Sequence, residues 1–151
     1  MAYDKDEVWK QGTVVKGFDK NTWRKDACDA WIKFDEYGNT KSKYGWQVDH
    51  IFPSSVLEDN EVQEDDRDNI INLRPLQWKN NDVKDKDYPK YDSAVTSFGN
   101  INIDKDTTRT VNKQKQHALE SFFSEHGQVD ITTYHNPHDD FLANVNFRIT
   151  A

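Results

Sequence analysis

The most regular alternation of apolar and polar residues covers residues 46–52 and predicts a β-strand. Successive side chains of a strand point to opposite faces of a sheet. One face of this strand would carry Trp46, Val48 and His50, and the other Gln47, Asp49 and Ile51. Pro53 ends the pattern, because proline has no N–H to donate to a neighbouring strand.

Weaker patterns follow this strand. Residues 54–69 are predicted to form a long acidic loop, and residues 70–78 an extended segment in which Pro75 marks an edge or a bulge. Residues 80–85 are expected to begin a short helix, because asparagine is a favoured N-cap and Asn80 stands at its start. The order of elements is therefore strand, loop, strand, helix.

The C-terminal region has a pattern of its own. Polar residues 93–106 are expected to separate it from the first part of the chain, and residues 108–126 to form an amphipathic helix ended by Gly127. The apolar stripe of that helix is Val111, Ala118, Leu119, Phe122 and Phe123. Residues 129–133 are predicted to be a strand, and a closing strand is predicted from the alternation of Val145, Phe147 and Ile149.

The N-terminal part is less regular, with mostly irregular structure over residues 9–26 and a short strand over residues 30–34. The whole pattern predicts an α+β protein. We expect residues 1–91 to form the main domain and residues 92–151 an extension, a helix and short strands, packed on the same domain.

Composition supports a folded chain of 151 residues in spite of its polarity, with 34% hydrophobic and 31% charged residues. Five Trp, eight Phe and six Tyr supply the large apolar surfaces that a compact core needs. The single cysteine, Cys28, excludes an intramolecular disulfide, and no apolar run is long enough to predict a membrane span. These features predict a cytoplasmic, intracellular protein without a membrane partner.

The formal net charge of −7 is unusual for a protein that binds nucleic acid, which relies on basic residues to neutralise phosphate. Residues 58–68 account for most of it, since they hold seven acidic residues and one basic residue. Without this acidic stretch, the chain's 27 acidic and 20 basic residues become 20 and 19. The charge therefore does not exclude a DNA-binding function.

Three segments carry candidate chemistry: Gly45 to Ile51 (GWQVDHI), Asn72 to Leu76 (NLRPL) and Trp78 to Lys84 (WKNNDVK). Taken singly they are weak signals, because asparagine pairs usually mark turns or helix caps. Together and in this order they resemble the HNH endonuclease family, in the variant whose last histidine is replaced by asparagine, as in RNA-guided CRISPR nucleases. The resemblance extends over roughly residues 8–91 and includes the lead-in WRKDAC at residues 23–28.

The resemblance implies a ββα-metal (HNH/His-Me finger) motif, two strands and a helix around one metal ion. It assigns His50 as the general base that activates water, and Asp49 and Asn81 as ligands of one Mg²⁺ or Mn²⁺ ion. Asn80 is the competing ligand. Asn72 would bond the backbone of the preceding loop and so orient His50. Asp49 and His50 alternate along a strand, so a local twist is required to bring both to one site.

Other positions allow two interpretations. Lys84 would contact a phosphate near the scissile bond or remain a solvated helix residue, and Arg74 would contact phosphate or pair with the acidic stretch. The acidic stretch itself replaces the short glycine-containing turn that the family commonly has. Asp29 follows Cys28 where the family often has glycine, which leaves the local turn open.

The resemblance thus predicts a metal-dependent endonuclease that cleaves DNA to leave 5′-phosphate and 3′-hydroxyl ends. The alternative is a phage- or virus-type DNA-binding or assembly accessory module with an HNH fold and little activity, which the negative charge favours. Retention of both metal ligands and the base favours the enzyme. The oligomeric state, the form of the DNA and any sequence preference are not predicted.

Overall fold

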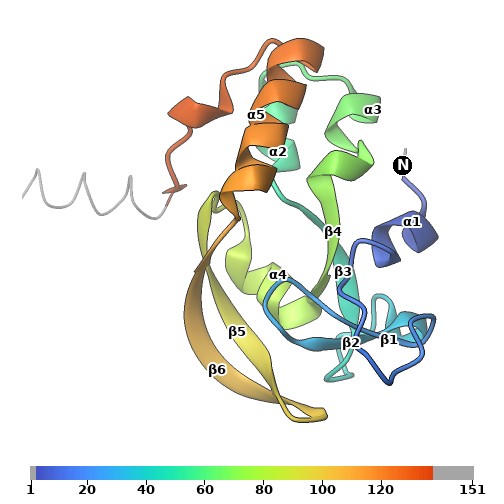
Figure 1. Cartoon of the computed structure of the whole chain (residues 1–151). Coiled ribbons are helices and arrows are strands. Elements are labelled where there is room, and N and C mark those ends of the chain that lie inside the picture. The colour runs from blue at the N-terminus through green and yellow to red at the C-terminus, as the bar shows by residue number, and fades with distance from the viewer. Residues whose placement is uncertain (1–2, 138–151) are drawn as a thin grey trace, which may run out of the picture.

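The computed structural model describes residues 3–137 and contains three two-stranded antiparallel sheets with short helices between them (Figure 1). The sheets pair β1 (Trp23–Lys25) with β2 (Trp31–Lys33), β3 (Trp46–His50) with β4 (Leu73–Gln77), and β5 (Lys90–Phe98) with β6 (Ile101–Thr110). The helices are α1 (Lys5–Trp9), α2 (Ser54–Asp59), α3 (Glu64–Arg67), α4 (Trp78–Lys84) and α5 (Lys113–His126). Short 3-10 turns are η1 (Phe34–Glu36), η2 (Ile70–Asn72) and η3 (Ile131–Thr133). This mixture of helix and strand is the α+β class that the sequence predicts.

The centre of the fold is the unit β3–β4–α4. Pro75 on β4 lies opposite Val48 on β3, and because this sheet has only two strands, its missing N–H interrupts no second ladder. The helix α4 follows β4 without a loop. It begins two residues before the predicted Asn80, because the side chain of Gln77 accepts hydrogen bonds from the backbone N–H groups of Lys79 and Asn80.

The predicted acidic loop over residues 54–69 is wrong in part, because it contains α2 and α3. Leu57 on α2 is fully buried and belongs to the larger core, so one apolar side of this polar segment packs inward. The acidic residues Glu64, Asp65 and Asp66 occupy the first turn of α3, where they favour the helix dipole.

The predicted polar separator over residues 93–106 is also wrong. These residues form most of the β5–β6 hairpin, and Thr108, the predicted helix start, lies on β6. The helix α5 begins five residues later, after Asn112, whose side chain accepts a hydrogen bond from the N–H of Lys115. The predicted boundary between residues 91 and 92 therefore falls inside β5.

The end of the described chain differs from expectation as well. The predicted strand over residues 129–133 is wrong, because η3 occupies this place and Asp130 caps it by accepting a hydrogen bond from Thr132 N–H. The predicted closing strand at Val145, Phe147 and Ile149 lies outside the described residues. Within residues 3–137, no helix is long and apolar enough to cross a membrane.

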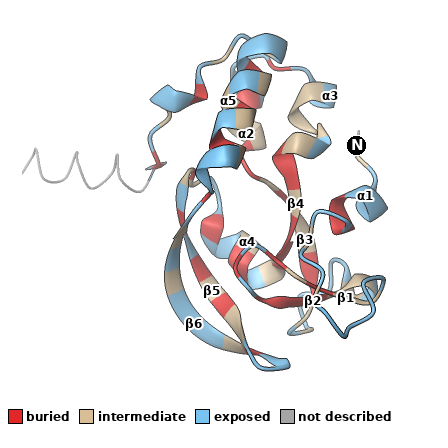
Figure 2. Cartoon of the chain, in the orientation of Figure 1, coloured by how far each residue is buried: buried red, intermediate tan, exposed pale blue. Residues whose placement is uncertain are grey.

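Two buried clusters hold the fold together (Figure 2). The larger one lies under α5, whose Leu119 and Phe123 are fully buried as the predicted stripe requires, and it includes Phe52 and Leu57. The smaller one packs α1 against β2, β3 and β4 through Val8, Trp9, Ile32, Trp46 and Leu73. The β3–β4 hairpin thus lies between the two clusters, and its end at His50 has fixed surroundings.

The short connection between β1 and β2 is also fixed. Asp29 has a φ of +63°, in the left-handed region that favours glycine. The buried carboxylate of Asp26 accepts hydrogen bonds from the N–H groups of Cys28 and Ala30 on either side of it. These bonds hold the turn in which Asp29 adopts a conformation that favours glycine.

We expect Cys28 to resist alkylation in the folded protein. Its side chain is fully buried, and burial together with the charge of Asp26 raises the pKa of the thiol to about 12. At about pH 8 roughly one thiol in 10⁴ is then ionised, and the thiolate is the reactive form. Iodoacetamide labelling followed by mass spectrometry should be at least about 10³-fold slower than in guanidinium chloride.

The raised pKa of Cys28 also predicts that the free energy of unfolding falls above about pH 9, where only the unfolded thiol ionises. Rapid labelling of the folded protein would contradict both the burial of Cys28 and its raised pKa.

Candidate active site

The carboxylate of Asp49 is buried between two cations. Arg74, its partner across the β3–β4 ladder, donates from Nε to Asp49 Oδ2 at 2.8 Å. Lys84, on the last turn of α4, places its ammonium 3.1 Å from Asp49 Oδ1. The Lys84 ammonium also donates to the His50 carbonyl at 3.2 Å, and its side chain is 0% exposed. Lys84 therefore joins the helix to the strand that carries the candidate residues.

These charges hold Asp49 in its ionised form. Burial by itself would raise the pKa of the carboxyl group, but the charges of Lys84 and Arg74 and their hydrogen bonds outweigh it and hold the pKa below its ordinary value. With both cations charged, the group Asp49–Arg74–Lys84 has a net charge of +1. Such a group attracts an anion.

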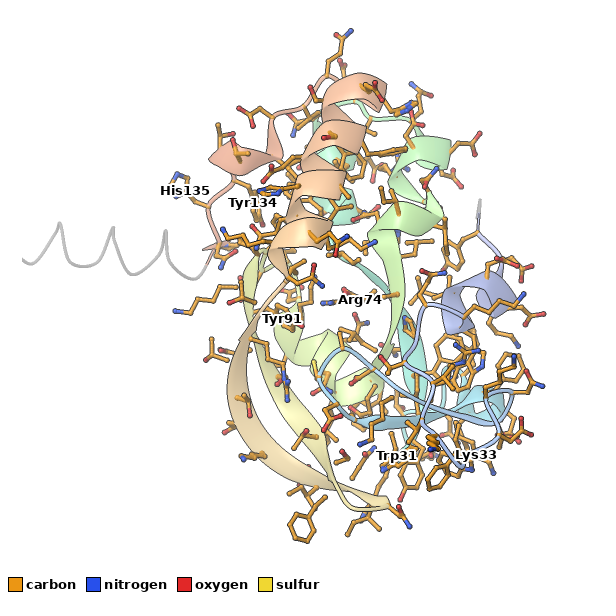
Figure 3. All side chains as sticks on the ribbon, in the orientation of Figure 1. Trp31, Lys33, Arg74, Tyr91, Tyr134 and His135 are labelled. Atoms are coloured by element: carbon orange, nitrogen blue, oxygen red, sulfur yellow. The ribbon has the colours of Figure 1, made fainter. Side chains whose placement is uncertain are left out.

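A cavity of about 380 Å³ lies beside Arg74. The guanidinium of Arg74 lies 5.1 Å from the ring centre of Tyr91, and Figure 3 shows the two side chains approaching each other in the middle of the molecule. The two charged residues that line the cavity are both cations, Arg74 and Lys115. Arg74 Nη2 is buried without a hydrogen-bond partner among the described residues. The cavity is therefore suited to an anionic ligand.

His50 turns to different partners. Its Nε2 lies 2.7 Å from Asp68 Oδ1, on the residue that follows α3, and its ring lies edge-on to Tyr3 with the ring centres 6.4 Å apart. The adjoining cavity of about 330 Å³ is acidic, lined by Asp4, Glu7, Asp65 and Asp68 among others. Within residues 3–137, the Asp49 carboxylate and the His50 ring make no contact with each other. The alternation of the strand persists at this position.

Asn72 fixes the chain that follows His50. Its side chain is fully buried; Oδ1 accepts from the N–H of Phe52 at 2.8 Å, and Nδ2 donates to the carbonyl of Phe52 at 3.0 Å and of Arg67 at 3.4 Å. The backbone carbonyl of Asn72 accepts from the N–H of Ile51 at 2.8 Å. One residue, directly before β4, therefore connects the segment that follows β3 with the last residue of α3.

The two asparagines of α4 have different roles. Asn80 is fully buried, and its amide bonds the backbone of β5 at Ala94 and Val95 and the carboxylate of Asp26. Asn81 is partly exposed, and its Nδ2 donates to Gln47 Oε1 at 2.9 Å. Asn80 is therefore fully used in holding β5. Asn81 Oδ1 accepts no hydrogen bond from a described residue and remains available to a ligand.

The contact between β3 and α4, called the seam below, carries side-chain oxygens of the kind that a hydrated Mg²⁺ ion prefers. Gln47–Asn81 and Asp49–Lys84 are neighbouring contacts between β3 and α4, because side chains two apart on a strand and three apart on a helix share a face. Asp49 and Asn81 would both present oxygen, and each carboxylate oxygen has more than one lone pair. Among the described residues, no group of three or more His, Cys, Asp or Glu side chains forms a metal site.

Three features were not anticipated from the sequence. The interpretation of Lys84 as a solvated residue is wrong, because it is completely buried. Arg74 pairs with Asp49 and not with the acidic stretch. Asp68, a member of that stretch, contacts His50, which no local pattern indicates because the two residues lie 18 positions apart.

The comparisons with known proteins do not identify a relative: no protein-family model matches the chain, and neither the curated proteins nor the solved structures give a match.

Proposed function

We propose that this protein is an HNH-type endonuclease that hydrolyses phosphodiester bonds of DNA, with β3–β4–α4 as its ββα-metal motif. The observation that carries the proposal is the set of hydrogen bonds from the Asn72 side chain to the backbone of Phe52 and Arg67, which we call the Asn72 clamp. In one strand–strand–helix unit, a buried asparagine holds the backbone just after His50, while Asp49 and Asn81 face the seam between the hairpin and the helix. The unit contains every residue type that the sequence motif requires, in the required order.

His50 is the proposed general base. A carboxylate only accepts hydrogen bonds, so the contact of Asp68 with Nε2 favours the tautomer that carries the proton there. Nδ1, which accepts no hydrogen bond from a described residue, then has the lone pair that would take a proton from water. An imidazole of this kind accelerates proton transfer by about 10²- to 10⁴-fold.

Arg74 and Lys84 are proposed to balance the charge of the phosphate at this seam. Both side chains pair with Asp49, and Arg74 borders the cationic cavity beside Tyr91. One Mg²⁺ or Mn²⁺ ion, held by Asp49 and Asn81, would supply Lewis-acid stabilisation of the phosphate and the leaving oxygen. Substrate binding must bring the phosphate between the His50 side and the Asp49 side of β3.

A second candidate function is a DNA-binding or assembly module with little activity. The observation that favours it is that Asp49 is already paired with two cations and His50 with Asp68. Such pairs can hold a fold without chemistry. The two functions differ in whether purified protein turns over its substrate.

A supercoiled-plasmid assay tests the proposal. We expect the purified chain at low salt to convert supercoiled plasmid to nicked or linear DNA with Mg²⁺ or Mn²⁺, and to stop completely in EDTA. Ligation of the product by DNA ligase without prior treatment would show the 5′-phosphate and 3′-hydroxyl ends. If folded protein binds DNA but does not nick it with either metal, the nuclease proposal is wrong and the binding module described above is the better interpretation.

A further inference from the structure

A third cavity, of about 360 Å³, lies on another part of the surface, between the start of α4, residues 41–43 and the β5–β6 hairpin. Three lysines line it: Lys41, Lys43 and Lys79. Apolar lining comes from Trp78, Val95, Ile101 and Ile103. The acidic residue on the lining is Asp104, so the charged side chains sum to +2. The cavity thus combines an aromatic and aliphatic surface with a positive rim.

The walls of this cavity are fixed by bonds from three different elements. The indole N–H of Trp78 donates to the Ser42 carbonyl at 2.9 Å. The Lys43 carbonyl accepts from Gln77 Nε2 at 3.2 Å and from Asn102 Nδ2 at 2.9 Å. Gly45 closes the segment, where a β-carbon would collide with the carbonyl oxygen of Asn39. The lysines are therefore carried by a rigid segment.

The ammonium groups themselves are available. Lys41 and Lys43 are exposed, and the pair of Lys79 with Asp104 spans 3.6 Å between side chains that are 45% and 83% exposed. Exposed pairs of this kind are weak and exchange readily for another anion. The tip of the hairpin adds two exposed apolar side chains, Phe98 and Ile101. This surface suits a ligand that is anionic on one side and flat and apolar on the other.

We propose that this cavity binds one nucleotide of an unpaired segment of the DNA substrate. Its base would lie against Trp78 and the isoleucines, and Lys41, Lys43 and Lys79 would contact the phosphates on either side. Base stacking on an aromatic side chain beside a basic groove is the usual means of binding single strands. A duplex would not place a base inside the cavity. The proposal deepens the nuclease function and rests on DNA as the substrate.

The test measures binding without cleavage. Fluorescence anisotropy of a labelled single-stranded oligonucleotide is followed in EDTA for wild type, for the double variant Lys41→Ala/Lys43→Ala, and for the control double variant Lys86→Ala/Lys113→Ala. Both pairs remove two exposed lysines, but the control pair does not line the cavity. We expect roughly tenfold weaker binding and a salt dependence shallower by about 1.4 in log–log slope for the cavity variant only.

Trp78 provides a second measurement. Trp78→Leu should weaken binding by about tenfold, and Trp78→Phe should restore most of it, because phenylalanine keeps a surface for stacking. Thermal unfolding shows which variants are folded. Equal losses for both lysine pairs, equal binding by Leu and Phe variants, or tighter binding of duplex would overturn the proposal.

The result separates this proposal from the nuclease function. If wild type nicks plasmid and the cavity variants bind the oligonucleotide as tightly as wild type, only the proposed nucleotide site is wrong. If binding depends on the cavity lysines but no nicking occurs with either metal, the nuclease proposal is wrong and the nucleotide site stands.

Discussion

Replacement of His50 by alanine should lower the rate of plasmid nicking by about 10²- to 10⁴-fold, with little change in DNA affinity. The imidazole is the group assigned to proton transfer, so its loss affects the chemical step more than binding. The His50 side chain is 22% exposed, and among the described residues it has one hydrogen bond, to Asp68. The variant should therefore fold, and initial rates over a series of enzyme concentrations measure the effect.

The matched control is His117→Ala. His117 is exposed on α5, in a part of the fold that carries no candidate active-site residue. Its rate should equal that of wild type when both are purified in the same way. If His50→Ala nicks at the wild-type rate, either a contaminant or another residue performs the reaction, and the assignment of the base fails.

The sequence predicted the central unit because its pattern is local. Alternation over residues 46–52 indicates β3, Pro75 marks the extended partner, and the asparagines indicate the following helix. The motif also singled out Asn72, whose contacts with the backbone of Phe52 are now visible. These features depend on residues that are close in sequence or on one family pattern.

The β5–β6 hairpin was not predicted because its alternation is hidden by polar residues. Tyr91, Ser93 and Val95 are all buried on β5, but serine at the middle position breaks the apolar pattern. On β6, Asn102 is the one buried residue, so the strand looks like a polar linker. On β6, pairing with β5 and the hydrogen bonds of Asn102 with the Trp31 backbone take the place of an apolar face.

Lys84 and Asp68 were misread for a related reason. Lysine is rarely buried completely, and its burial here depends on a carboxylate that is 35 residues earlier in the chain. The acidic stretch looked like solvated sequence, but α3 turns Asp68 toward His50. Interactions of this kind appear only when the tertiary structure places the partners side by side.

The two sides of β3 set a requirement for the proposed reaction. Asp49 faces Arg74 and Lys84, whereas His50 faces Asp68 and Tyr3. A single phosphate must therefore reach both sides at the end of the strand, or the strand must twist when the substrate binds. The Asn72 clamp holds the backbone at Phe52, two residues after His50. A twist at Asp49 and His50 would therefore leave the chain after it in place.

The largest effect on stability is expected for Asp49→Asn. The amide has nearly the shape of the carboxylate but no charge, so Arg74 and Lys84 become two buried cations without a counterion. Removing one partner from a buried pair costs about 3–5 kcal/mol, a large part of the roughly 5–15 kcal/mol that stabilises a typical domain. Urea denaturation followed by tryptophan fluorescence should show a lower midpoint at an unchanged slope.

Two further variants show whether charge is the reason. Glu7→Gln removes an exposed partner of Lys10, a pair 3.4 Å apart, and should change stability by less than about 1 kcal/mol. Adding Lys84→Met to Asp49→Asn removes one of the two uncompensated cations and should recover part of the loss. A loss below about 1 kcal/mol for Asp49→Asn would mean that the carboxylate does not hold these cations in the native state.

This prediction also decides how activity data on the site can be interpreted. A variant at Asp49 that loses nicking has lost both a proposed metal ligand and a buried structural charge, so its inactivity does not identify the metal site. Asn81 is partly exposed, and within residues 3–137 its side chain has one hydrogen bond, to Gln47, so Asn81→Ala should remain folded. If Asn81→Ala needs a higher Mg²⁺ concentration for nicking while its urea midpoint stays within about 1 kcal/mol of wild type, the ligand role is separated from the structural one. An unchanged Mg²⁺ requirement would contradict the assignment of Asn81 as a metal ligand.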